Sequence, residues 1–141
     1  MISDPVARYS IAEQWATVIK LAAHDAFQRM TPGGVLINYG PPPGGYYNLP
    51  LILAYCVLDE FLTAAIGEGV FSAPAAAMLG RKMHASLPNV TWLDFGGVDL
   101  GREKRNDVAH KGLLLDRDEC RRIVALVGQE LAGWGLVSQA V

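Results

Sequence analysis

A charged stretch from Gly101 to Gly112 carries the side chains best suited to chemistry in this chain. It contains Arg105, Asn106 and His110, with four residues between the arginine and the histidine. An arginine keeps its charge near neutral pH and binds a phosphate through two parallel hydrogen bonds. A histidine is the side chain that most readily gains or loses a proton at that pH. Together they indicate phosphodiester chemistry that needs no metal ion.

Other charged residues could support this pair. Cations of the same stretch would add local positive potential for RNA phosphates, namely Arg102, Lys104 and Lys111. A buried guanidinium needs a carboxylate partner, and Asp59 or Glu60, which interrupt an apolar segment, could orient Arg105 from across the fold. The ordinary alternatives are that acids in mid-helix are solvated, and that the charged stretch is a solvated helix face ending in a histidine that complements the helix dipole.

The composition limits the class of protein. The chain has 141 residues, which fits one domain spanning 1–141 with a hydrophobic core. Hydrophobic residues make up 51% of it and charged residues 18%. We expect such a domain to expose apolar surface that a partner covers, most simply a second copy of the chain. The formal net charge of −2 argues against a protein that coats nucleic acid generally, because that class is basic.

Cysteine usage and the N-terminus bear on cofactors and location. Cys56 and Cys120 lie far apart in apolar helical patterns and match no metal-ligand spacing. We therefore expect two buried, reduced thiols, no metal and no cofactor. The N-terminus lacks the pattern of a signal peptide, and the apolar run 49–58 is too short to cross a bilayer. These features predict a cytoplasmic protein that does not contact a membrane.

Apolar residues recur at helical spacing over five stretches, which capping residues, glycine or proline delimit. The predicted helices, with their N-cap residues, are 5 to about 30 (Ser3 or Asp4), 49 to 67 or 69 (Asn48), 73 to about 86 (Ser72), 100 to about 110 (Asp99) and from 117 onward (Asp116). Residues 90–98 could form a short helix or an ordered loop. No internal repeat and no convincing strand is found. The sequence predicts an all-α, up-and-down bundle of four to five helices without significant sheet.

Glycine and proline dominate residues 31–48. They exclude a helix and a central strand from this long loop, and the glycines lack the lysine and preceding strand of a phosphate-binding P-loop. Its tyrosines, Tyr39, Tyr46 and Tyr47, could stack on a base or a partner. The interpretation we favour is that they pin the loop to the bundle.

The segment Arg105-Asn106-x-x-x-His110 resembles the motif of the HEPN domain, the higher eukaryote and prokaryote nucleotide-binding family. In that family an arginine, often followed by a polar residue, precedes a histidine by four to six intervening residues. As in the family, the segment lies late in a small helical bundle and is followed by a glycine, Gly112, and one more amphipathic helix. The apolar–acidic run 51–62 also looks like the family. Only the one motif is specific, although the helical order covers most of the chain.

The resemblance implies a homodimer in which two motif helices form one composite cleft. It also implies, for many members, a metal-independent endoribonuclease of a toxin–antitoxin or other defence system, with an antitoxin protein as a possible partner. Arg105 would bind the scissile phosphate, and His110 would act as general base or acid while the ribose 2′-OH attacks the phosphorus. Asn106 would position the phosphate or fix the histidine tautomer. Other members are inactive modules that bind nucleotides, RNA or proteins.

Helix geometry constrains how the pair can work together. Five residues advance an α-helix by about 500°, so Arg105 and His110 lie about 140° apart around a regular helix. They could converge if the helix frays or turns near His110, as Gly112 permits, or if a second subunit supplies one of them.

Three hypotheses follow, and a structure can separate them. A ribonuclease requires Arg105 and His110 to be available in one cleft. A catalytically silent binding module would keep the fold and the cleft, and in it Arg105 could be tied up in an ion pair with Asp59, Glu60 or Asp107. An unrelated helical dimer would bury or scatter the motif.

Overall fold

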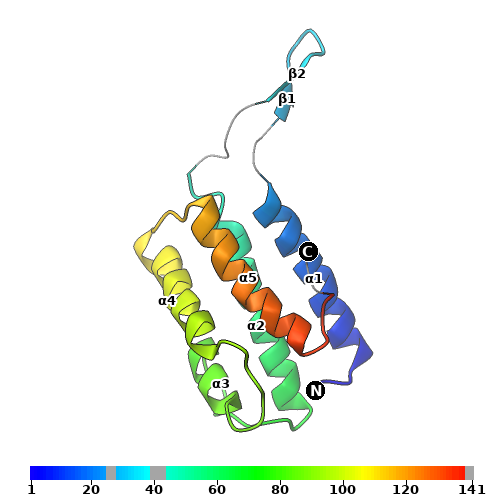
Figure 1. The fold of residues 1–141 in the computed structure, drawn as a ribbon, viewed down its shortest axis with the longest axis vertical. Coiled ribbons are helices and arrows are strands. Elements are labelled where there is room, and N and C mark those ends of the chain that lie inside the picture. The colour runs from blue at the N-terminus through cyan, green and yellow to red at the C-terminus, as the bar shows by residue number, and fades with distance from the viewer. Residues whose placement is uncertain (25–27, 39–43, 139–141) are drawn as a thin grey trace.

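The computed structural model describes residues 1–24, 28–38 and 44–138. The four long helices α1, α2, α4 and α5 run alternately up and down and form one bundle with the short α3, which confirms the predicted all-α fold (Figure 1). They are α1 (Pro5–Ala23), α2 (Asn48–Gly67), α3 (Leu79–Ser86), α4 (Phe95–Lys111) and α5 (Arg117–Gly133).

The helix α2 is the centre of the bundle. It packs against α1, α3, α4 and α5, and most of its apolar side chains are buried, among them Leu51, Tyr55, Leu58, Phe61 and Leu62. Because the helix continues beyond the apolar run 49–58, it is long and apolar enough to cross a membrane by length and composition alone. Half of that stretch is buried inside the bundle, and the core helix of a soluble protein has the same properties.

The first helix is shorter than predicted. It begins at Pro5 behind its predicted cap Asp4, whose carboxylate accepts a hydrogen bond from the Val6 N–H at 3.1 Å. It ends at Ala23 rather than near residue 30, and Gln28–Met30 form a strand, β1, instead. Helices in proteins are stabilised mainly by packing, and no helix contacts this segment. A longer α1 would therefore lack a neighbour.

A β-hairpin extends beyond the bundle, where no strand was expected. The strand β1 pairs antiparallel with β2 (Leu36–Asn38), with Arg29 opposite Ile37. A turn joins them, closed by a hydrogen bond from the Thr31 N–H to the Val35 carbonyl at 2.8 Å. Figure 1 shows the hairpin standing clear of the helices. The two short strands leave the fold class unchanged.

The end of the glycine- and proline-rich loop is attached to α1. The Tyr46 hydroxyl donates to the Leu21 carbonyl at 3.1 Å, and the Tyr47 hydroxyl donates to the His24 carbonyl. These bonds confirm that both tyrosines pin the loop to the bundle. Tyr39 lies outside the described residues.

Two helix starts differ from their predicted positions. The helix α3 begins at Leu79 rather than near Ala73, because Ala76 has a left-handed backbone conformation (φ 60°) that a helix cannot contain. The helix α4 begins at Phe95 and is capped by Asp94, not by Asp99. Residues 95–98, whose structure the sequence left open, are therefore its first turn.

The start of α4 is fixed by a buried carboxylate. Glu130 of α5 accepts hydrogen bonds from the backbone N–H groups of Leu93 (2.6 Å) and Asp94 (2.9 Å). Asp94 then accepts from the Gly97 N–H at 2.9 Å. The sequence around Asp94 does not predict this contact, because Glu130 lies on another helix.

The predicted end of α4 and the predicted cap of α5 are confirmed. Gly112 terminates α4 with a left-handed conformation (φ 67°), and Asp116 caps α5 by accepting from the Glu119 N–H at 2.8 Å. Asn48, in contrast, is the first residue of α2 and does not cap it, since Tyr47 is at the N-cap position without a side-chain bond.

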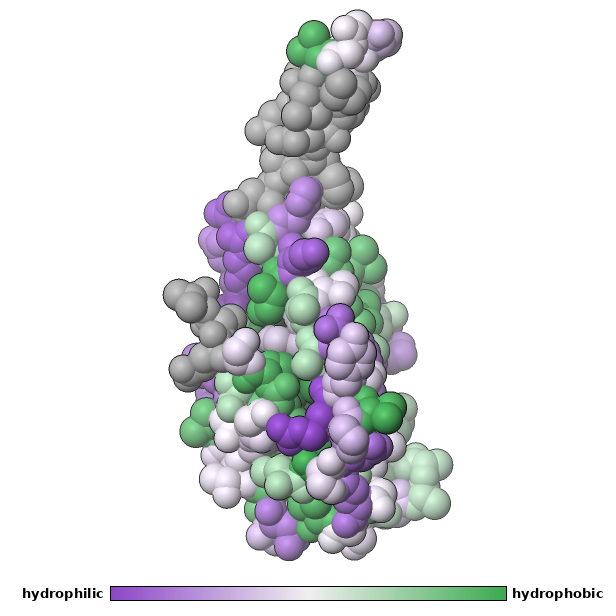
Figure 2. Space-filling model, turned by 90° about the vertical axis from the view of Figure 1, so that its right-hand side faces the viewer, coloured by the Kyte–Doolittle hydropathy of each residue, from purple (hydrophilic) through white to green (hydrophobic). Residues whose placement is uncertain are grey.

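The two cysteines differ in environment, although both were expected to be buried. Cys120 is buried, and desolvation raises the pKa of its thiol to about 11. Cys56 is exposed, as are Leu49 and Thr63, which lie seven residues to either side of it on the same stripe of α2. Several large apolar side chains are exposed as well, including Val6, Tyr9, Leu49, Leu93, Leu100 and Leu114. On the face shown in Figure 2, hydrophobic and hydrophilic residues are interspersed.

Candidate functional site

The helix α4, which carries the charged stretch, is seated firmly in the bundle. Its buried residues Val98, Gly101 and Val108 face the core. Gly101 permits a close approach, since a Cβ atom there would overlap the Tyr55 hydroxyl and the Ile123 side chain. That hydroxyl donates to the Val98 carbonyl at 2.7 Å, and burial raises the pKa of Tyr55, so it remains a donor. These contacts hold the part of the α4 backbone that precedes the motif against α2 and α5.

Arg105 lies on the same stripe of α4 as Gly101 and Val108 and is half-buried. Its Nη1 donates to the Asn106 Oδ1 at 3.2 Å. Its Nε is buried and has no hydrogen-bond partner. Within the described part of the chain Arg105 forms no ion pair, and its one recorded side-chain hydrogen bond is to Asn106.

The other arginine and lysine side chains of α4 are paired with carboxylates. The pairs are Arg102–Asp99 (2.8 Å), Lys104–Glu119 (3.8 Å) and Lys111–Asp107 (3.3 Å). Because a nearby carboxylate balances each charge, these cations contribute less positive potential than the sequence indicated. The Lys111 pair is exposed, and such pairs are weak enough to exchange for a phosphate.

The acids of α2 do not orient Arg105, which was the alternative to the ordinary interpretation of solvated mid-helix acids. Asp59 pairs with Lys82 of α3 at 2.9 Å, and Glu60 accepts a hydrogen bond from Gln14 of α1. The reason is the antiparallel packing of α2 and α4. Tyr55 lies level with Val98, so residues after Tyr55 are level with the start of α4, far from Arg105. The partners Lys82 and Gln14 could not be identified in the sequence, because only the fold sets this register.

His110 is exposed in the last turn of α4. The helix does not fray there: it continues to Lys111, and the Gly112 N–H bonds the Asp107 carbonyl. The backbone separation of about 140° between Arg105 and His110 therefore persists. Asn106 and His110, however, are four residues apart and share one flank of the helix. Because the guanidinium of Arg105 reaches Asn106, it is directed toward this flank.

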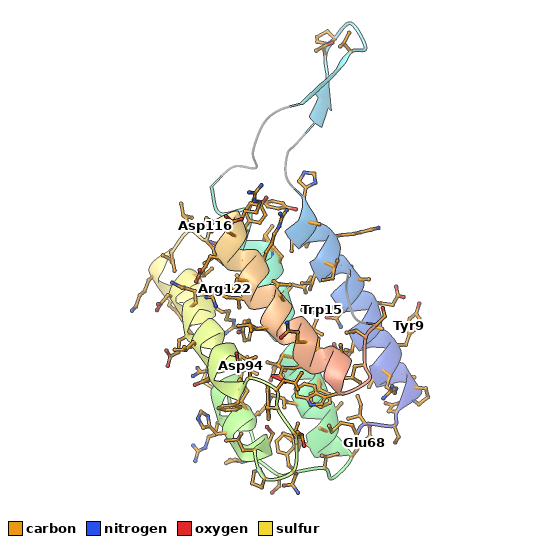
Figure 3. All side chains as sticks on the ribbon, viewed as in Figure 1. Tyr9, Trp15, Glu68, Asp94, Asp116 and Arg122 are labelled. Atoms are coloured by element: carbon orange, nitrogen blue, oxygen red, sulfur yellow. The ribbon has the colours of Figure 1, made fainter. Side chains whose placement is uncertain are left out.

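The array Arg105, Asn106 and His110 thus combines a guanidinium and an accessible imidazole near the C-terminal end of α4. Figure 3 shows Asp116, the cap of α5, near one end of the bundle and Asp94, the cap of α4, farther from that end, so the C-terminal part of α4 with the array lies toward the Asp116 end. A guanidinium and an imidazole in this arrangement can bind a phosphate and exchange a proton. Among the residues that the structure describes, no three histidine, cysteine or acidic side chains gather where they could hold a metal ion.

Comparisons of the chain with protein-family models, with curated proteins and with solved structures give no match. The resemblance to the HEPN family therefore depends on the spacing of the array and on its place in the helical bundle.

Proposed function

We propose that this chain is a metal-independent endoribonuclease of the HEPN type. The observation that carries the proposal is the state of Arg105. Within the described residues, it is the only arginine or lysine of α4 without a carboxylate partner. Its buried Nε also lacks a hydrogen-bond partner. A guanidinium withdrawn from water needs an anion, and a phosphate of RNA supplies two oxygens in matching geometry.

In the proposed reaction the ribose 2′-oxygen attacks the adjacent phosphorus and the bond to the 5′-oxygen breaks. The products are a 2′,3′-cyclic phosphate and a 5′-hydroxyl. Arg105 binds the non-bridging oxygens and stabilises their developing charge. His110 takes the 2′-OH proton or donates one to the leaving oxygen. Asn106, whose oxygen accepts from Arg105, orients the guanidinium.

The proposed active form is a homodimer. On one regular α4, Arg105 and His110 leave the helix about 140° apart, and a second copy could supply the missing partner to each site.

We further propose that the chain is a cytoplasmic toxin or defence effector, which an antitoxin protein would restrain. The competing hypothesis, a silent binding module, would have been supported by a pair of Arg105 with Asp59, Glu60 or Asp107. It loses that support, since the three acids pair with or accept hydrogen bonds from other residues.

RNA cleavage in EDTA tests the proposal. We expect the wild-type protein to cut RNA, and both Arg105→Ala and His110→Ala to lose activity by about 10²- to 10⁴-fold. Matched controls are Arg81→Ala and His84→Ala, which remove the same side-chain types from exposed positions on α3 and should leave cleavage unchanged. Equal cutting by all five proteins would mean that the array is not the active site. Binding of RNA without cutting by any of them would favour the silent module.

Mixing the two inactive variants tests the composite site. If Arg105 and His110 act from different subunits, a mixed dimer contains one intact site, and activity returns to a measurable fraction of the wild-type rate. If both act from one subunit, no intact site forms and the mixture stays inactive.

A further inference from the structure

The connector between α4 and α5, residues 112–116, is held by the first residue of α2. The Asn48 Nδ2 donates to the Leu113 carbonyl at 2.9 Å, and the Asn48 Oδ1 accepts from the Leu115 N–H at 2.9 Å. One side-chain amide thus fixes a carbonyl and an N–H two residues apart. This contact joins the end of the long loop to the segment that directly follows His110.

Other contacts hold the same connector. The Leu115 side chain is buried, and the Leu114 side chain lies over Gly44 and Gly45, where an added Cβ would be 3.5 or 3.4 Å from it. On the other side, the N–H groups of Gly112 and Leu113 both bond the Asp107 carbonyl in the last turn of α4. The connector therefore links Asn48, through hydrogen bonds and side-chain contacts, to the turn of α4 that carries His110.

Asn48 is suited to this role by its chemistry. Only a side chain with both a donor and an acceptor can satisfy the Leu113 carbonyl and the Leu115 N–H at once, and leaving either unsatisfied away from water is costly. Because Asn48 does not cap α2, its amide is available to the connector. Helix ends are the parts of a bundle that open most readily, so a contact that closes this end affects His110 more than it affects the core.

We propose that Asn48 is a positioning residue for His110, holding the last turn of α4 closed through residues 113–115. That Asn48 orders this turn is argued from the hydrogen bonds alone. That the ordered turn affects RNA cleavage rests on the proposed function.

Hydrogen exchange followed by NMR, together with cleavage kinetics, tests this inference. We expect Asn48→Ala to speed exchange of the amides of residues 108–115 by about tenfold or more, the order expected for two lost hydrogen bonds. Core amides, such as those of Leu58 and Val127, should keep their protection. In cleavage, kcat should fall by about tenfold or more with KM unchanged, because misplaced groups slow the chemical step. The control is Asn89→Ala, which removes an exposed asparagine side chain far from the connector.

In the variant Asn48→Asp, lowering the pH should restore the hydrogen bonds to the connector. At neutral pH the introduced carboxylate can accept from the Leu115 N–H but faces the Leu113 carbonyl without a donor. In acid the protonated carboxyl has both a donor and an acceptor. Protection of residues 108–115, compared with wild type at each pH, should therefore be low at neutral pH and return in acid.

Several results would overturn the inference. They are unchanged exchange at residues 108–115 in Asn48→Ala, an equal loss of protection throughout the bundle, or an unchanged kcat when the wild type is active. If the wild type does not cut RNA, the proposed function fails, and the exchange rates alone decide whether Asn48 orders the turn of His110.

Discussion

Arg105 shows how burial and pairing together single out one side chain among several of the same charge. The cations around it lie near carboxylates of α4 or α5, so their charges are balanced within the protein. Arg105 is half-buried, and among the described residues its partner is the neutral Asn106. Removing a guanidinium from water without a counter-charge costs free energy, and a bound anion would recover that cost. The same comparison cannot be made from the sequence, where all these residues look alike.

The two thiols provide a prediction at this scale. We expect a thiol reagent such as Ellman's reagent to modify Cys56 in the folded protein and Cys120 only after unfolding. With a pKa of about 11, Cys120 is roughly 0.1% thiolate near pH 8, and it is also buried. The measurement is the number of reactive thiols per chain, which should be one when folded and two in denaturant. Folded Cys56→Ser should not react, and its rapid reaction would show that Cys120 is accessible.

At the scale of elements, the close contact of α4 with α2 and α5 determines where the array lies. Gly101 is the point of closest approach, level with Tyr55 of α2 and Ile123 of α5. This contact sets the antiparallel register that keeps Asp59 and Glu60 away from Arg105. It therefore determines both the stability of α4 and the electrostatics of the site.

Substitution of glycines within α4 tests this contact. We expect Gly101→Ala to lower the free energy of unfolding by about 1–3 kcal/mol, because the added methyl group forces α4 away from its neighbours. The control is Gly96→Ala in the first turn of the same helix, where a Cβ meets no other atom within 4 Å. It should leave stability unchanged or raise it by up to about 1 kcal/mol. Urea unfolding measures both, and equal effects of the two substitutions would contradict the packing argument.

At the scale of the whole molecule, the chain divides into a helical bundle and a hairpin that contacts none of its helices. A two-stranded hairpin is at best marginally stable by itself. The bundle has a continuous core of its own, and the loop is already tied to it beyond the hairpin by Tyr46 and Tyr47. We therefore expect the hairpin to be dispensable for folding.

Replacement of residues 28–38 by a flexible Gly/Ser linker of equal length tests this division. We expect the melting temperature, measured by circular dichroism, to change by no more than about 2 °C, because no contact with a helix is lost. A scrambled hairpin sequence of the same composition serves as the control. A fall of about 10 °C or more would mean that the hairpin stabilises the bundle.

The sequence alone determined those features that arise from interactions close along the chain. Helical periodicity predicted the five helices, and local chemistry identified the caps Asp4 and Asp116 and the terminator Gly112. It also located the Arg105–His110 motif, since residue spacing is a property of the chain. Starts and ends failed where local preference was overridden, as at Ala76, where the backbone conformation prevents a longer α3.

Only the tertiary structure decided what each side chain faces. Asp59 and Glu60 are adjacent in sequence, yet one pairs with α3 and the other accepts a hydrogen bond from α1. Asn48 has the residue type of a helix cap but binds a connector that lies far away along the chain. The physical reason is that hydrogen bonds and ion pairs between helices depend on helix register. Register is set by the packing of many side chains at once, such as Gly101 against Tyr55, and no single stretch of sequence contains it.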